Sequence, residues 1–185
     1  MYRILLLLHY VCFLISPNRH IIEKDLKRRQ LYHPSFTQST FKMLSHALWN
    51  EPEYRNQFYY RLGKWTRRIL NVLLPSLQNI DLSNSYIDEG LVIIHGYNIV
   101  INPLVRIGKN CTMLHEVTIG AIKGGIPTIG DNVFIGCGAK ILGGVSIGNN
   151  VKIGACAVVL SDIPDNATVV GFPAHIVKKK KQETI

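Results

Sequence analysis

The sequence predicts a mainly β protein, a parallel β-helix of six-residue repeats, preceded by an α-helical N-terminal segment. Two observations support this prediction. From residue 87 onward an aliphatic side chain recurs about every six residues, whereas apolar residues before residue 78 follow the three- and four-residue spacing of amphipathic helices. We therefore divide the chain of 185 residues into a helical segment, 1–78, a β-helix domain, 79–177, and a basic tail, 178–185.

Within the helical segment, the predicted helix after Asn50 is the clearest. Pro52 and Glu53 suit a first helical turn, Asn50 suits its cap, and Pro75 would end the helix. An apolar stripe follows, made of Tyr54, Phe58, Leu62, Trp65, Ile69 and Leu73.

The repeat is defined by the residues that begin each unit. A glycine or asparagine often stands three residues later, where a tight corner needs positive φ. Neither the helical period nor strand alternation explains this pattern, so we expect the leading residues inside a coil and residues 121–128 as an outward loop. Steps of eight and ten residues interrupt the period after the third and sixth leading residues, which are, in order, Ile87, Ile93, Ile99, Ile107, Met113, Ile119, Ile129, Ile135, Ile141, Ile147, Ile153 and Val159.

Composition excludes several classes of protein. With 47% hydrophobic and 18% charged residues, the chain is not a disordered tail. Its four cysteines form no C-x-x-C pair, which excludes a cysteine zinc finger and a disulfide-stapled miniprotein. The net charge of +9 is concentrated in residues 1–85, with 12 Lys/Arg against 5 Asp/Glu. This favours peripheral contact with a membrane over nucleic acid, although a solubilising surface explains the charge equally well.

The first residues are the most hydrophobic stretch of the chain. Residues 4–15 are too few to span a bilayer and are interrupted by His9. We expect a buried or membrane-surface helix, with a cleaved signal peptide as the alternative. The predicted location is the cytoplasm, at the inner face of the membrane if the basic segment binds lipid.

The repeat also predicts a reactive corner. His95 follows Ile93 by two residues and His115 follows Met113 by two, so the two histidines are expected to stack roughly 4.8 Å apart on adjacent coils. Cys137 and Ala155 continue the same column. Small side chains would leave a groove for a thin ligand, and a neutral imidazole at its foot would take a proton from a hydroxyl.

Three motifs carry a resemblance to a known family: residues 95–103 (HGYNIVINP), 117–120 (VTIG) and 127–130 (PTIG). They resemble the hexapeptide-repeat acyltransferases, in particular serine O-acetyltransferases and capsule or exopolysaccharide O-acetyltransferases of the colanic acid type. The resemblance covers about residues 87–177. It implies left-handed coils, a homotrimer, and acetyl-CoA bound along the edge between two subunits.

The resemblance also implies the roles of single residues. The general base falls on His95, with His115 as a second candidate catalytic residue. Cys137 lies in the column without a basic partner, so we expect direct acetyl transfer rather than an acyl-enzyme. A zinc lyase on this fold needs three converging histidines, which the sequence does not supply, so no metal is expected. Acetyl-CoA is expected at Gly120, Ala121, Cys137, Gly138 and Ala155.

Differences from the serine enzymes decide the predicted acceptor. Ile94 stands where those enzymes have an aspartate and Ile126 where they have a second histidine, and Asp81 aligns with their base-orienting aspartate only after a one-residue shift. The sequence therefore predicts an acetyl-CoA-dependent O-acetyltransferase acting on a saccharide hydroxyl in capsule or exopolysaccharide biosynthesis. L-Serine as acceptor is the alternative. Transfer to an amine of a nucleotide sugar and an inactive scaffold also remain open.

Overall fold

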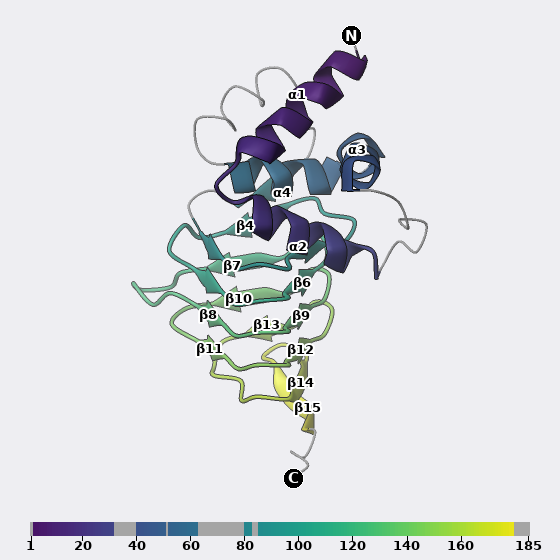
Figure 1. The fold of residues 1–185 in the computed structure, drawn as a ribbon. Helices are drawn as coiled ribbons and strands as arrows, with labels where there is room; N and C mark the ends of the chain where they lie inside the picture. Colours follow the sequence, from purple (N-terminus) through teal and green to yellow (C-terminus); the bar gives the residue numbers. More distant parts are fainter. Residues whose placement is uncertain (1, 32–39, 51, 63–79, 83–84, 180–185) are drawn as a thin grey trace. The chain divides into compact units, whose positions relative to one another are not determined.

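The computed structural model describes residues 2–31, 40–50, 52–62, 80–82 and 85–179 (Figure 1). The chain divides into two compact units, residues 1–78 and 79–185. The described part of the first unit is helical, and that of the second consists of short strands that pair in parallel except at the C-terminal strand. The predicted fold class, a parallel β-helix preceded by α-helices, is confirmed.

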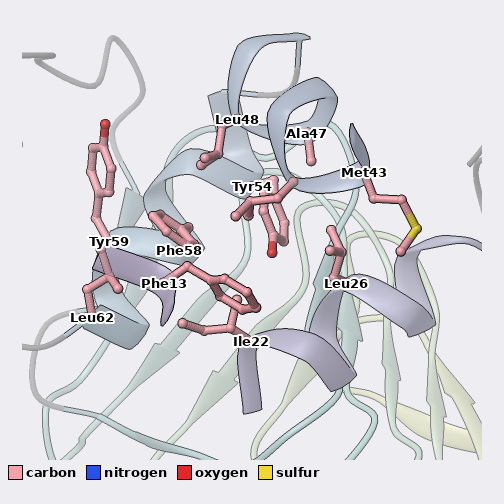
Figure 2. Packing of buried hydrophobic residues seen from close by; sticks show 11 residues of the cluster. Phe13, Ile22, Leu26, Met43, Ala47, Leu48, Tyr54, Phe58, Tyr59 and Leu62 are labelled. Carbon is pink, nitrogen blue, oxygen red and sulfur yellow. The ribbon is translucent and has the colours of Figure 1, made fainter. Parts of the chain in front are cut away.

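The helical unit contains α1 (Tyr2–Ile15), α2 (Arg19–Arg29), α3 (Thr40–Asn50) and α4 (Pro52–Leu62). Their apolar faces meet in one core, which Figure 2 shows from close by. Burial of this apolar surface stabilises the short helices, which would be marginal in isolation. The core consists of Phe13, Ile22, Leu26, Met43, Leu44, Ala47, Leu48, Tyr54, Phe58, Tyr59 and Leu62.

Two buried polar contacts join helices that are far apart in the sequence. His9 Nε2 lies 2.9 Å from the hydroxyl of Tyr59, and burial raises the pKa of Tyr59 to about 12. The Arg61 guanidinium donates to the Asp25 carboxylate at 2.8 Å, and both side chains are almost fully buried. These contacts fix the pairing of α1 and α2 with α4.

The structure changes the predicted helix boundaries. Asn50 ends α3 instead of capping the next helix, and α4 begins at Pro52. Tyr54, Phe58 and Leu62 are buried as the stripe predicts, whereas its later members lie outside the described residues. Residues 4–15 belong to α1, and no helix in the described ranges has the length and apolar character to cross a membrane.

The second unit winds through three flat faces in turn, and strands on one face pair in parallel between successive coils. The first face holds β1 (Ile80–Asp81), β4 (Ile99–Ile101), β7 (Thr118–Gly120), β10 (Lys140–Leu142) and β13 (Val158–Val159). The second holds β2 (Tyr86–Ile87), β5 (Arg106–Ile107), β8 (Thr128–Ile129) and β11 (Ser146–Ile147). The third holds β3 (Val92–Ile93), β6 (Thr112–Met113), β9 (Phe134–Ile135), β12 (Lys152–Ile153), β14 (Ala167–Val170) and β15 (His175–Lys179).

The interior of the coils is aliphatic. All twelve leading residues predicted from the repeat are buried, with exposed fractions of 7% or less. Small or branched side chains one position before each strand, such as Val117, Ala139 and Ala157, are buried beside them. The predicted inward orientation of the leading residues is confirmed. Each six-residue unit forms one face of the coil, so its leading side chain points inward once on every face.

The corner between the second and third faces is held by a polar ladder. Asn132 donates its backbone N–H to the carbonyl of Lys109 one coil earlier, and the Asp131 carboxylate accepts the N–H of Lys109 at 2.7 Å. The same exchange recurs between residues 131–132 and 149–150, and between 149–150 and 165–166. Asn132, Asn150 and Asn166, whose backbone N–H groups donate in this ladder, have positive φ, near 57° in Asn132. At this corner, a backbone N–H of each coil therefore donates to a side-chain oxygen of the next coil.

The ten-residue step corresponds to a small hairpin. Ile122 and Gly125 exchange two backbone hydrogen bonds across Lys123 and Gly124, both of which have positive φ. Residues 121–124 are exposed, as the prediction of an outward loop requires. Figure 1 shows this hairpin projecting from the coils just before β8.

The C-terminal strand closes the stack. β15 pairs antiparallel with β14, and a register irregularity lies between Thr168 and Val169. Lys178 and Lys179, which the sequence assigned to the tail, belong to this strand. Residues 180–185 lie outside the described part of the chain.

Candidate active site

The candidate site lies at the corner between the third and first faces, here called the third corner, residues 94–98, 114–117, 136–139 and 154–157. The third-face strands that lead into this corner pair in the predicted register, but β4 and β7, which follow it, do not. Ile101, not Ile99, pairs with Ile119, and Ile99 pairs with Ile80. The eight-residue step therefore runs from Ile93 to Ile101, and the two additional residues lie in the corner that carries His95.

This shift places Tyr97, and not His95, as the first residue of the column. The N–H of Glu116 bonds to the carbonyl of Tyr97, as the N–H of Gly138 bonds to His115 and that of Cys156 to Cys137. The column is therefore Tyr97, His115, Cys137 and Ala155. The prediction that His95 and His115 stack directly is wrong, because the extra residues move His95 out of the column.

His95 lies in the extended turn that these extra residues create. Its backbone has φ of 50° and its side chain is exposed. Positive φ is uncommon for a residue with a side chain. Asn98, at the end of the same turn, also has positive φ. The imidazole is accessible to a substrate hydroxyl, which a general base requires.

His115 and Tyr97 form a stacked pair. Their ring centroids are 5.2 Å apart with an interplanar angle of 8°. The His115 side chain is half-buried, and its Nδ1 is buried without a hydrogen-bond partner in the described structure. Sequence reasoning missed Tyr97, although choosing Ile101 as the leading residue would have placed it in the column.

Glu116 is attached to the same pair. The Tyr97 hydroxyl donates a 2.8 Å hydrogen bond to Glu116 Oε1, and this bond raises the pKa of Tyr97 above its ordinary value. Lys140 Nζ donates to the backbone carbonyl of Glu116 at 2.7 Å and to the hydroxyl of Thr118. The Glu116 backbone has φ of 59°, so the corner presents this side chain in an unusual conformation.

Above this pair the column becomes small. Cys137 and Gly138 are half-buried and Ala155 is exposed. Within the third corner, nothing larger than a thiol projects from residues 136–139 and 154–157, so the backbone is accessible to a narrow ligand. Gly120 and Ala121 are not at this corner, because Gly120 ends β7 and Ala121 follows it, at the opposite edge of the first face.

The substituted positions of the serine enzymes are apolar here. Ile94 is half-buried beside His95 in the chain, and Ile126 is half-buried at the base of the hairpin. Asp81 pairs with Val100 on the first face and so does not belong to the third corner. Across the described ranges, no three His, Cys, Asp or Glu side chains gather as a metal site would require.

Comparisons with known proteins extend this picture. Residues 126–161 match the family model "Bacterial transferase hexapeptide (six repeats)". The serine acetyltransferase of Staphylococcus xylosus is 38% identical over 139 residues, which are 72% of this chain and 64% of that protein. That of Helicobacter pylori strain 26695 is 36% identical over 143 residues, 75% of this chain and 78% of that protein. The chain thus spans just under two thirds of the first relative and over three quarters of the second.

Solved structures of serine acetyltransferases are also similar to this chain. The Neisseria gonorrhoeae serine acetyltransferase in complex with serine has a TM-score of 0.70 and 32% identity, covering 87% of this chain and 69% of that one. A serine acetyltransferase has also been solved in complex with CoA. The coils described above are therefore the left-handed parallel β-helix that the resemblance implied.

The predicted saccharide acceptor is wrong. Relatives at 36–39% identity over most of the chain are named serine acetyltransferases, which supports the alternative acceptor. Ile94 and Ile126 carried too much weight in that prediction, since the rest of the chain retains the similarity despite them. The repeat model, the coverage of these relatives and the common fold together show that the chain belongs to the serine acetyltransferase family of hexapeptide-repeat transferases.

Proposed function

We propose that this protein is an acetyl-CoA-dependent serine O-acetyltransferase with His95 as its general base. The similarity to serine acetyltransferases over most of the chain carries this proposal. His95 supports it because the histidine is exposed in the motif that the resemblance identifies.

The reaction is a direct transfer in a ternary complex. His95 removes the proton of the serine hydroxyl while the oxygen attacks the thioester carbonyl carbon. The tetrahedral intermediate then loses the sulfur of CoA, which takes the proton from the imidazolium. Cys137, Gly138 and Ala155 supply the narrow edge for acetyl-CoA.

His115, the second candidate catalytic residue, supports the site through its contact with Tyr97. Its ring is stacked on Tyr97 and its Nδ1 is buried. The buried Nδ1 is closed to a substrate, and the ring is a packing surface for Tyr97.

The proposed assembly is a homotrimer. Exposed apolar side chains on or beside the first face include Val100 at 51%, Leu104 at 61% and Ile122 at 45%. Apolar patches of this kind favour a protein interface. In a trimer, the first face of one subunit would close the open side of the cofactor edge. Light scattering should give three times the chain mass of 20.9 kDa, and a fully active monomer would contradict the trimer.

A cytoplasmic location at the inner membrane face completes the proposal. Residues 1–85 carry 12 Lys/Arg against 5 Asp/Glu, a charge that anionic headgroups attract. The apolar side of α1 offers side chains for the lipid interface, because Leu7, Leu8, Val11, Leu14 and Ile15 are exposed.

Turnover with purified protein tests the function. Free thiol is followed after mixing acetyl-CoA with L-serine, and L-alanine, which lacks the hydroxyl, serves as control acceptor. His95→Ala should lose about 10²–10⁴-fold in kcat while acetyl-CoA still binds. Cys137→Ala should retain most activity. Absence of serine-dependent thiol release in the wild type would refute the proposal, and an acetylated Cys137 in the mass spectrum would replace direct transfer with a two-step mechanism.

A further inference from the structure

The third corner contains a carboxylate that the mechanism above does not use. Among the described residues of this corner, Glu116 is the one carboxylate. It is exposed, and no cation of the described chain pairs with it, since the ammonium of Lys140 is directed to the backbone carbonyl and to Thr118. An accessible carboxylate without a counter-ion attracts a cationic ligand.

The carboxylate is held in one position. Its Oε1 accepts the Tyr97 hydroxyl at 2.8 Å, and the Tyr97 ring is fixed in turn by the parallel stack on His115. Oε2 remains available to a ligand. The exposed face of Tyr97, which is 43% accessible, adds an aromatic surface beside that oxygen. A carboxylate next to an aromatic face is a favourable site for an ammonium group.

The backbone supports a ligand-directed role for Glu116. The equivalent positions on the other coils are Asn98, Gly138 and Cys156, and all four residues have positive φ. Glutamate is not a residue that this conformation favours. Strained positions of this kind concentrate at functional sites.

The position of Tyr97 and Glu116 relative to His95 indicates which ligand the carboxylate binds. Tyr97 is two residues after His95 in the same turn, so the pair lies on the corner where the acceptor hydroxyl must lose its proton. The two positions that would hold an amino-acid acceptor by resemblance are occupied by Ile94 and Ile126. On the basis of the proposed function, we infer that Glu116, held by Tyr97, binds the α-ammonium group of the serine acceptor.

Glu116→Gln tests this role, because the amide keeps an oxygen for Tyr97 and removes the charge. The KM for L-serine should rise about 10- to 100-fold, the loss expected for a charge-assisted hydrogen bond, with little change in the KM for acetyl-CoA. Tyr97→Phe, which keeps the stack, should raise the same KM by a smaller factor. Glu89→Gln is the matched control, since that carboxylate pairs with Lys109 at another corner and its removal should leave both constants unchanged.

A second acceptor separates recognition from structure. 3-Hydroxypropanoate has the hydroxyl and carboxylate of serine without the ammonium, so Glu116→Gln and wild type should acetylate it equally well. Equal KM values for L-serine in wild type and Glu116→Gln, or an equal loss with both acceptors, would overturn the inference while leaving serine acetylation intact. Failure of the wild type to acetylate L-serine would instead refute the proposed function, and this inference with it.

Discussion

Gly136→Ala should destabilise the coil stack beside the proposed cofactor edge. A Cβ at Gly136 would lie 2.6 Å from the backbone N of Ala155, 2.8 Å from the carbonyl carbon of Gly154 and 3.0 Å from the Cα of Ala155. The first distance is about 0.8 Å shorter than an ordinary contact of 3.4 Å. Backbone atoms of the next coil cannot rotate away, so the two coils must separate.

The magnitude follows from two opposing effects. Overpacking a well-packed interior costs typically about 1–3 kcal/mol, and the reduced entropy of the unfolded alanine chain offsets about 0.4–1 kcal/mol. The free energy of unfolding should therefore fall by roughly 1–2 kcal/mol, which lowers the melting temperature of a unit of this size by about 5–10 °C.

The matched control is Gly120→Ala. Gly120 also follows a buried isoleucine, but its Cβ would meet side-chain atoms alone, the flexible end of Leu142 at 3.3 Å and the methyl group of Thr118 at 4.0 Å. Thermal unfolding followed by far-ultraviolet circular dichroism of both variants measures the difference. If Gly136→Ala unfolds at the same temperature as Gly120→Ala, close approach of the coil backbones does not limit this position.

The other predictions concern the helical unit and the proposed chemistry. Asp25→Ala should reduce the free energy of unfolding by about 3–5 kcal/mol, because it leaves the buried Arg61 guanidinium without its carboxylate. The control Glu23→Gln, at the exposed pair with Arg19, should reduce it by less than about 1 kcal/mol. Equal losses of both variants in urea unfolding would contradict this prediction. His95→Ala should abolish most turnover while Cys137→Ala does not, as thiol release measures. Glu116→Gln should raise the KM for L-serine but not for 3-hydroxypropanoate, and light scattering should report a trimer.

The six-residue repeat made the fold predictable. It did not determine the register between β4 and β7, which follow the third corner. A six-residue aliphatic period requires a coil whatever the remaining residues are, and every leading residue is buried. Ile99 and Ile101 are both aliphatic and both buried, so either could begin the unit. Only hydrogen bonding to β7 distinguishes them, and that choice decides whether His95 or Tyr97 contacts His115.

The acceptor could not be predicted for a related reason. Ile94 and Ile126 are substitutions at single positions, and a site can replace lost polar groups with residues elsewhere on the same corner. Glu116 has no motif of its own, and its relation to Tyr97 depends on the two-residue extension of the turn. Likewise, His9 and Tyr59 are 50 residues apart, so no local pattern shows their contact.

The polar ladder at the corner between the second and third faces has a consequence for the length of the molecule. The backbone N–H of Lys109 donates to the Asp131 side chain, that of Asp131 to Asn149 and that of Asn149 to Asp165. Every interior coil therefore offers the same donor to the following coil and the same acceptor to the preceding one. Inserting or deleting one whole coil would leave the number of unsatisfied groups at the two ends unchanged. The stack behaves as a set of interchangeable modules, and stability should scale with their number. Evolution or design can thus change the height of such a protein without redesigning its cross-section.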